Sequence, residues 1–201
     1  MGLGLRRRFE DTGMMEAVPL RIAIVGTSGS GKSTLARRIA ADRDLPCIEL
    51  DAINWGPGWA NLSRMDPAAF VSRVEAAIAP DGWVVDGNYR IAQPLVLRLA
   101  TDVVWLDYSR AVVMRRVLAR SFSRALRAIE LWPGTGNRES WRRWLDAEHP
   151  IRWAWDTHAA NRARYEVLLC GNNRPNACVH RVRTPTDLSP ALARLSARHR
   201  R

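Results

Sequence analysis

Nine consecutive residues in the first quarter of the chain have the types and the spacing to bind phosphate. They fit the pattern G-x-x-x-x-G-K-[ST], in which glycines let the backbone turn tightly and the first N–H groups of the next helix face an anion. Their lysine, Lys32, is the only lysine in a chain that otherwise relies on arginine. An ammonium is a compact, flexible point charge, so its placement here predicts contact with nucleotide phosphates. The nine residues are Gly26, Thr27, Ser28, Gly29, Ser30, Gly31, Lys32, Ser33 and Thr34.

Three aspartates each follow an apolar run, and their carboxylates suit the chemistry of phosphoryl transfer. Within the loop pattern, Ser33 would offer its hydroxyl to Mg²⁺. Asp86 suits a carboxylate that holds a water of that ion. Asp51 could accept a proton from an attacking hydroxyl, or it could orient the acceptor. We interpret Asp107 as a cap for the helix that begins near Arg110.

Five arginines could bind the anionic groups of two substrates. Arg90 follows the third apolar run in Asp-Gly-Asn-Tyr-Arg, where it could clamp an acceptor phosphate with two hydrogen bonds. Steps of four and three residues place Arg116, Arg120, Arg124 and Arg127 on one face of a single helix. Like charges in such a row repel one another unless an anion compensates them. We predict that Arg116 and Arg120 contact the triphosphate and that Arg124 and Arg127 form a solvated face.

The elements that must position these residues are strands that alternate with helices. Helical patterns cover residues 33–41, 67–79, 110–129 and 152–169. This alternation predicts a three-layer α/β domain, in which a parallel sheet has helices on both faces and ligands bind at the carboxyl ends of the strands. A Gly/Ser linker could match the loop pattern by chance, but it would not have a strand before it and an amphipathic helix after it. The predicted strands are Leu20–Val25, Cys47–Leu50, Trp83–Val85, Val103–Leu106 and Val179–Val182.

Length and composition indicate a single cytoplasmic domain. We predict a disordered extension over residues 1–19, without the apolar stretch of a signal peptide, and one domain over residues 20–201. No apolar run approaches the ~20 residues of a membrane span, which argues against a membrane partner. The three cysteines are odd in number and lack metal-ligand spacing, so we expect buried small side chains in a reducing cytosol. They are Cys47, Cys170 and Cys178.

The formal net charge of +11 favours acidic partners. From Arg110 to Arg164 the chain has twelve arginines against five acidic residues. This excess could line a phosphate site, or it could bind nucleic acid, for which no helix-turn-helix or zinc motif gives support. Oligomeric state cannot be inferred from the sequence.

Tryptophan is unusually frequent, with nine in 201 residues. Trp55 and Trp59 lie in a Trp-Gly-Pro-Gly-Trp loop that should overhang the site, where they could either stack on a ligand or fill volume. For the later group we expect packing. That group comprises Trp132, Trp141, Trp144, Trp153 and Trp155.

Taken together, these motifs resemble adenylate kinase and related P-loop small-molecule kinases, and most closely the compact "topology modulation protein" branch. The resemblance covers residue 21 to about residue 195, and it implies a strand order of 2-3-1-4-5 and a helical lid over about residues 121–155. It implies that Arg116 and Arg120 flank the donor nucleotide and that Arg152 and Arg162 form a lid-side pair. It also implies that Asp86 serves magnesium and Arg90 the acceptor phosphate. Asn88 and Tyr89 replace the Phe-Pro of adenylate kinases, and the Trp-Gly-Pro-Gly-Trp loop differs from the segment that binds AMP in them. These departures argue against AMP and leave a sugar, a nucleoside, another small metabolite and an RNA end open as acceptors.

The sequence therefore predicts an enzyme, a kinase that moves the γ-phosphate of ATP, with Mg²⁺, to a small acceptor. Guanine-specific GTPases usually carry an Asn-Lys-x-Asp motif, which a chain with a single lysine, already in its P-loop, cannot supply. A nucleic-acid-associated P-loop ATPase or regulator is the alternative, because of the basic charge and the tryptophans.

Overall fold

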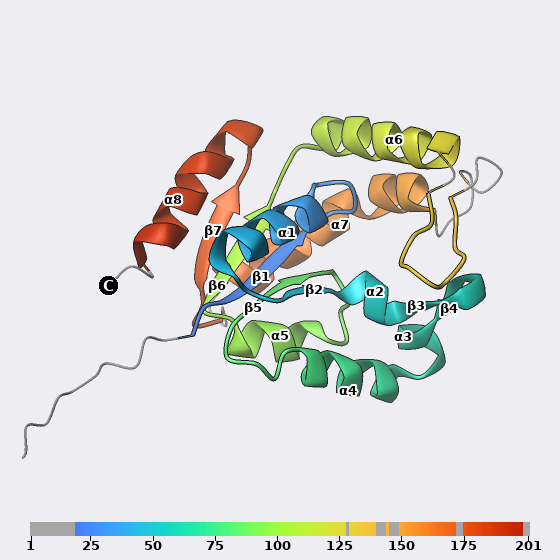
Figure 1. Ribbon diagram of the computed structural model, residues 1–201. Coiled ribbons are helices and arrows are strands. Elements are labelled where there is room, and N and C mark those ends of the chain that lie inside the picture. Colours follow the sequence, from blue (N-terminus) through green and yellow to red (C-terminus); the bar gives the residue numbers. More distant parts are fainter. Residues whose placement is uncertain (1–18, 128, 140–143, 145–148, 172–174, 199–201) are drawn as a thin grey trace, which may run out of the picture.

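A parallel five-stranded sheet forms the centre of the computed structural model, which describes residues 19–127, 129–139, 144, 149–171 and 175–198 (Figure 1). The strands lie in the order β2-β5-β1-β6-β7, and all four pairings are parallel. Counted along the chain within this sheet, the order is 2-3-1-4-5. The strands are β1 Arg21–Gly26, β2 Cys47–Glu49, β5 Trp83–Asp86, β6 Asp102–Leu106 and β7 Cys178–Val182.

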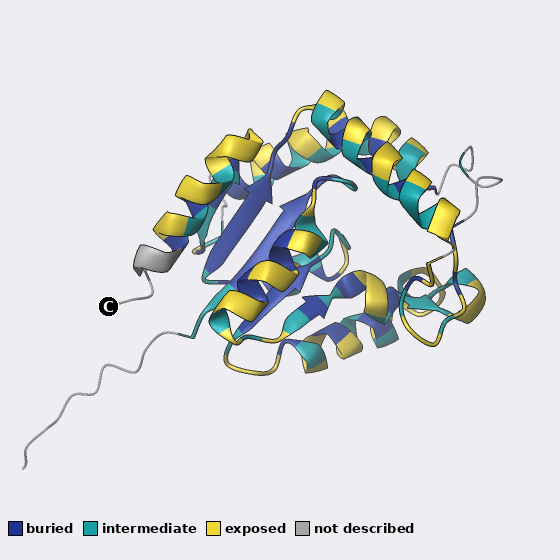
Figure 2. Cartoon of the chain, turned by 45° about the horizontal axis from the view of Figure 1, so that its top comes forward, coloured by how far each residue is buried: buried dark blue, intermediate teal, exposed yellow. Residues whose placement is uncertain are grey.

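Six longer helices cover the two faces of this sheet. Along β1, Ile22 and Ile24 pack against α1, α6 and α8, whereas Ala23 and Val25 pack against α4, α5 and α7. Alternate side chains of a strand point to opposite faces, so both faces of the sheet are buried, as Figure 2 shows. The predicted α/β fold class is confirmed. The helices are α1 Lys32–Arg43, α4 Pro67–Ala77, α5 Gln93–Leu99, α6 Arg110–Arg127, α7 Pro150–Cys170 and α8 Leu188–Arg198.

A small subregion after β2 was not predicted from the sequence. It contains a two-stranded antiparallel ribbon in which Trp55 pairs with Asn61. Its strands have two residues each, too few to show a period of alternating side chains. The elements are α2 Leu50–Asn54, β3 Trp55–Gly56, a 3₁₀ turn at Pro57–Trp59, β4 Ala60–Asn61 and α3 Leu62–Met65.

The segment that follows α6 lies against this ribbon, although some eighty residues separate the two in the chain (Figure 1). The side-chain amide of Asn137 joins them. Its Nδ2 donates to the carbonyl of Gly56 at 2.9 Å, and its Oδ1 accepts from the N–H of Trp59 at 3.0 Å. The described part of the predicted lid over residues 121–155 therefore contacts the subregion after β2, and lid movement stays a prediction.

Other expectations about the whole chain have mixed outcomes. The predicted N-terminal extension over residues 1–19 lies, apart from residue 19, outside the described residues. Among the described helices, none combines the length and the apolar character needed to span a membrane. The expectation of buried cysteines is wrong. Cys170 is exposed at the end of α7, and Cys47 and Cys178 are half-buried near strand starts, all three with free thiols.

Candidate functional site

The loop between β1 and α1 is shaped by glycines that no other residue could replace without strain. Gly26, Gly29 and Gly31 have φ angles of 148°, 81° and 98°. A Cβ on Gly26 would lie 2.7 Å from the carbonyl oxygen of Leu106, and one on Gly29 would lie 2.8 Å from Cβ of Val117. Only a glycine tolerates both the positive φ and this close approach. The loop is therefore held tightly between β6 and α6.

The first turn of α1 is open to an anion. Gly31 stands at the N-cap, no side chain caps the helix, and its first turn has no acidic residue. Lys32 Nζ donates to the carbonyl of Thr27 at 3.4 Å, and Arg116 Nη1 donates to the carbonyl of Ser30 at 2.8 Å. Two cationic groups thus flank a helix N-terminus whose dipole also favours negative charge.

Asp86, the last residue of β5, is a buried carboxylate that the protein leaves partly unpaired. It is 5 % exposed and hydrogen-bonded to the hydroxyl of Ser33. Its Oδ1 has no hydrogen-bond partner among the described residues. Burial raises the pKa of Asp86, and the nearby Lys32 charge and the Ser33 hydrogen bond offset part of that rise. A buried oxygen without a described donor, in a carboxylate beside the Ser33 hydroxyl, fits a hydrated cation.

Asp51 lies on α2 at the edge of the same site. Tyr89 donates its hydroxyl to Asp51 Oδ1 at 2.7 Å. Burial is the main cause that raises the pKa of Tyr89, and the charge of Asp51 adds to it, so the phenol keeps its proton and remains a donor. The charge of Asp51 also raises the pKa of Asp86, which shows that the two carboxylates belong to one electrostatic neighbourhood.

Arg120 extends from α6 toward these carboxylates. Burial, and then the like charge of Arg124, lower its pKa to about 10, while Glu139, Asp51 and Asp86 act in the opposite direction. Arg116 therefore contacts the phosphate loop, and Arg120 lies within electrostatic reach of the two aspartates, whereas contact of either with a triphosphate stays a prediction. Arg124 does not form a solvated face. Its Nη1 lies 3.8 Å from the buried Glu139 of the segment after α6.

One solved kinase structure has a similar architecture. A gluconokinase from Sinorhizobium meliloti 1021 aligns with a TM-score of 0.52 at 20% sequence identity, over 90% of this chain and 94% of that chain. A shikimate kinase from Bacteroides thetaiotaomicron aligns with a TM-score of 0.48 at 14% identity, over 89% of this chain and 97% of that chain. The sequence matches no protein-family profile, and no curated relative matches it. The chain therefore shares with the gluconokinase an α/β fold in which helices cover both faces of a parallel sheet.

Three further arginines that the sequence singled out lie after β5 and on α7. Arg90 is exposed and lies beside a groove between α5 and α7. Arg152 Nε lies 3.4 Å from Asp156 on its own helix. Arg162 Nε lies 3.0 Å from Asp107. Their roles toward the acceptor and the lid stay predictions.

The interpretation of Asp107 as a helix cap is wrong. Its Oδ2 accepts two hydrogen bonds from Arg181 on β7, at 2.9 and 2.7 Å, and its Oδ1 faces Arg162 on α7. The cap position of α6 falls to Ser109, whose hydroxyl accepts from the N–H of Val112 at 3.5 Å. A carboxylate that is 5 % exposed needs charged partners, and two arginines supply them.

Asn88 is a residue of the site that the sequence analysis noted only as a departure from adenylate kinases. Its Nδ2 donates to the carbonyl of Gly26 at the start of the phosphate loop. Its Oδ1 accepts from the hydroxyl of Tyr165 on α7 at 2.7 Å. The amide thus ties the loop to the long helix. Its place directly after a strand end and a glycine was the one available signal.

Three tryptophans form a cluster where the ribbon meets the segment after α6. Trp55 stacks on Trp132 at 6.2 Å, and Trp59 meets both rings edge-on, at 5.8 and 6.0 Å. Trp59 and Trp132 have φ angles of 63° and 61°, which are unfavourable for bulky residues. Both roles proposed for Trp55 and Trp59 remain open, since these rings pack on one another and stay half-exposed.

The expectation of packing holds for only part of the later tryptophans. Trp132 packs in the cluster just described, and Trp144 lies 6.4 Å from the ring of His149. Trp153 and Trp155 are exposed, which contradicts the expectation, and Arg110 lies over Trp155 at 5.0 Å. Trp141 lies outside the described residues.

Proposed function

We propose that this protein is an adenylate kinase-like phosphotransferase that moves the γ-phosphate of Mg-ATP to a small acceptor. One observation carries the proposal. An uncapped helix N-terminus, the only lysine of the chain, and a buried aspartate with an unpaired oxygen meet at the carboxyl edge of the sheet. Phosphoryl transfer requires positioning and charge neutralisation more than covalent chemistry, and these groups provide both.

The donor side of the site is formed by the phosphate loop and α6. The backbone from Gly26 to Thr34 would cradle the phosphates of ATP, and Lys32 would neutralise the β and γ oxygens. Arg116 is already fixed against the loop through the carbonyl of Ser30, and Arg120 extends toward the site aspartates. Because a fixed cation needs no reorganisation during the reaction, such positions favour stabilisation of the developing charge.

Ser33 and Asp86 would hold the magnesium ion. When bound, Mg²⁺ neutralises charge on the phosphate oxygens that surround it. The residues present fit the ion, because Ser33 offers a hydroxyl and Asp86 offers an oxygen that no described donor engages. The burial that raises the pKa of Asp86 would be opposed by a cation beside it.

The acceptor would bind between α2 and the loop after β5. Asp51 is oriented by the Tyr89 hydroxyl, which leaves its other oxygen to accept a proton from the acceptor or to orient it. Arg90 follows Tyr89 and would bind an anionic group of the acceptor, which makes a nucleotide one of the substrates to test. Arg152 and Arg162 would act from α7 on closure.

A single panel of acceptors tests the proposal. ATP consumption with Mg²⁺ is measured in the presence of nucleotides, nucleosides, sugars and oligonucleotides. We expect one small-molecule class to accelerate it and chelation of Mg²⁺ to abolish it. Lys32→Ala should lower transfer at least about 100-fold with an unchanged circular dichroism spectrum. Arg38→Ala, which removes an exposed ion pair to Asp42 on the same helix, is the matched control and should keep full activity.

The net charge of +11 favours the second function, a nucleic-acid-associated ATPase, and the same panel separates it. In that case an oligonucleotide, not a small molecule, would stimulate hydrolysis, and its binding would weaken steeply with salt. Full turnover by Lys32→Ala would contradict both functions, since both depend on the phosphate loop.

A further inference from the structure

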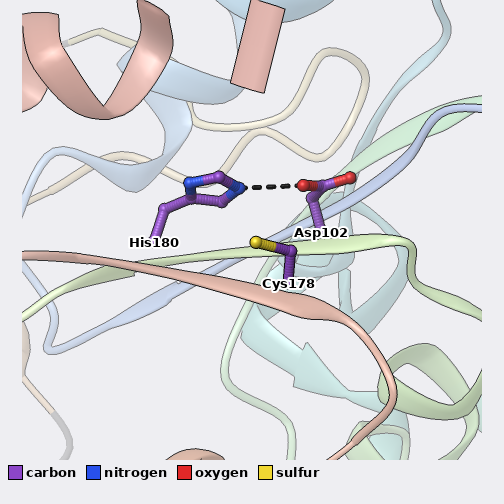
Figure 3. A group of neighbouring side chains, drawn as sticks. All are labelled: Asp102, Cys178 and His180. Carbon is purple, nitrogen blue, oxygen red and sulfur yellow. Dashed lines mark hydrogen bonds and ion pairs between the residues drawn. The ribbon is translucent and has the colours of Figure 1, made fainter. Parts of the chain in front are cut away.

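Three side chains with metal-binding atoms meet at the amino-terminal ends of β6 and β7 (Figure 3). Asp102 is the first residue of β6, and it pairs in register with Cys178, the first residue of β7. His180 follows two residues later on β7 and therefore points to the same face of the sheet. A carboxylate oxygen, the thiol sulfur and a ring nitrogen of the three all lie within 4.8 Å of one another.

This cluster is separate from the proposed kinase site. The phosphate loop begins at Gly26, which pairs with Leu106 at the other end of β6. Three residues of β6 lie between Asp102 and Leu106, which are therefore about 13 Å apart along the strand. A ligand at the cluster would therefore act on the structure, at the edge of the sheet, without touching the phosphates.

The donor set and its surroundings suit a borderline-soft divalent ion. Asp102 is 0 % exposed and His180 is 6 % exposed, whereas Cys178 is half-buried and has a free thiol. His180 Nε2 and Asp102 Oδ1 are 2.8 Å apart. Sulfur, imidazole nitrogen and carboxylate oxygen together are the donors that zinc takes in proteins. Strands also hold such donors more firmly than loops do.

We propose that Asp102, Cys178 and His180 bind one Zn²⁺ ion, with water as the fourth ligand. Tetrahedral zinc has ligand bonds of about 2.0–2.3 Å, which set its donor atoms roughly 3.3–3.8 Å apart. His180 Nε2 and Asp102 Oδ1, which are 2.8 Å apart, must therefore separate by about half an ångström through side-chain rotation. On binding, the thiol releases its proton, and the thiolate and carboxylate then balance the two positive charges. The ion would fasten the edge strand β7 to β6.

The three cysteines have no metal-ligand spacing in the sequence, and the structure explains why. Cys178 and His180 are only two residues apart, and Asp102 is 78 residues from His180 in the chain. The third ligand arrives through strand pairing, which no local motif records.

Titration with Co²⁺, a spectroscopic substitute for zinc, tests the site in the full-length, tag-free protein. We expect one equivalent to bind, with a thiolate-to-cobalt charge-transfer band in the near ultraviolet and d–d bands of tetrahedral intensity. Zn²⁺ should displace it stoichiometrically. Cys178→Ser should abolish the charge-transfer band and weaken binding at least about 100-fold. The matched control Cys170→Ser, which removes an exposed thiol elsewhere, should leave both unchanged.

Thermal unfolding gives a readout that does not depend on a variant's folding. Zinc at about 100 times its Kd should raise the Tm of the wild-type chain by roughly 5–10 °C, and the rise should vanish in Asp102→Asn. Absence of stoichiometric binding in the wild type would show that Asp102 and His180 are a self-sufficient hydrogen-bonded pair and would overturn the proposal. So would a cobalt spectrum that persists in Cys178→Ser. Neither outcome bears on the kinase proposal, because the phosphate loop is not involved.

Discussion

Two aspartates lie at the carboxyl ends of the strands that flank β1: Asp86 is the last residue of β5, and Asp107 directly follows β6. Both are 5 % exposed. Asp107 has each of its carboxylate oxygens engaged by an arginine, at 2.7 Å to Arg181 and 3.0 Å to Arg162. Asp86 has one oxygen without any described donor, and burial raises its pKa.

This difference separates a structural carboxylate from a ligand-binding one. Burial of a charge without a partner is costly, so a protein keeps such a group only where something else compensates it. At Asp107 the compensation is internal, and at Asp86 it would come from a bound cation. In the sequence both aspartates directly follow an apolar run, so the pattern alone does not distinguish the structural carboxylate from the ligand-binding one.

The largest expected effect is the loss of phosphoryl transfer when the ligand-binding carboxylate, Asp86, is replaced. Asp86→Asn should lower Mg²⁺-dependent phosphoryl transfer at least about 100-fold, because the amide cannot neutralise a cation, and should change ATP binding much less. Initial rates across a magnesium series measure this. In the folded fraction of the Asp107→Asn variant, the rate of phosphoryl transfer should keep the magnesium dependence of the wild type. An unaltered magnesium profile in Asp86→Asn would remove that residue from the metal site.

For the free energy of unfolding, we expect replacement of Asp107 to have a larger effect than replacement of Asp86. Asp107→Asn should lower the free energy of unfolding by about 3 kcal/mol, since it leaves two arginines facing a neutral amide. Urea denaturation followed by tryptophan fluorescence measures it. The control Asp156→Asn breaks an exposed ion pair with Arg152 and should cost less than about 0.5 kcal/mol. Equal losses in the two variants would show that the arginines around Asp107 contribute little.

The pH dependence of stability sharpens the comparison further. Burial raises the pKa of Asp86 in the folded protein above its usual 3.8. In the window of pH between the usual and the raised pKa, the folded state therefore holds more protons than the unfolded state. This carboxyl therefore lowers the free energy of unfolding as pH rises through the window. Asp86→Asn removes the loss, and the stability of the variant relative to wild type should rise with pH above about 4 and then level off. Denaturation at several pH values without Mg²⁺ measures it, and a flat difference would contradict it.

The smallest expected effect is on nucleotide binding at the phosphate loop, which follows β1. Asn88→Ala removes the donor to the carbonyl of Gly26 and the acceptor of Tyr165. Loss of about 1 kcal/mol of positioning should weaken binding of a fluorescent ATP analogue roughly fivefold. Asn88→Asp keeps the acceptor but not the donor. It should weaken binding at least as much if the contact to Gly26 is what matters, whereas wild-type binding in this variant would assign the effect to Tyr165.

The fold was predictable because its signals are local. Each of the five predicted strands begins and ends within one residue of the observed one, since buried strands of a parallel sheet are continuous apolar runs. The ribbon at Trp55–Asn61 was not predictable, because it owes its position to Asn137, about eighty residues away in the chain. Periodicity cannot report a contact of that kind.

In the site, too, residues marked by a local pattern could be predicted, and contacts between distant parts of the chain could not. A motif predicted the phosphate loop, a strand end predicted Asp86, and a helical step predicted that Arg116 and Arg120 share one face of α6, and their roles toward a substrate stay predictions. The partners of Asp107 were missed because Arg181 is 74 residues away and pairs only once β6 and β7 are adjacent. Asn88 was missed as a link because its two partners lie on β1 and α7, which meet only in the folded chain.

Because Lys32 is the only lysine, its chemical modification can measure occupancy of the phosphate loop. Apart from the α-amine, the chain offers acylating reagents one side-chain amine, and that amine lies against the phosphate loop, where it donates to the carbonyl of Thr27. A single mass increment on one tryptic fragment would therefore count unoccupied molecules directly. Any compound that slows its appearance could be ranked as an occupant of the loop, before a single acceptor has been found.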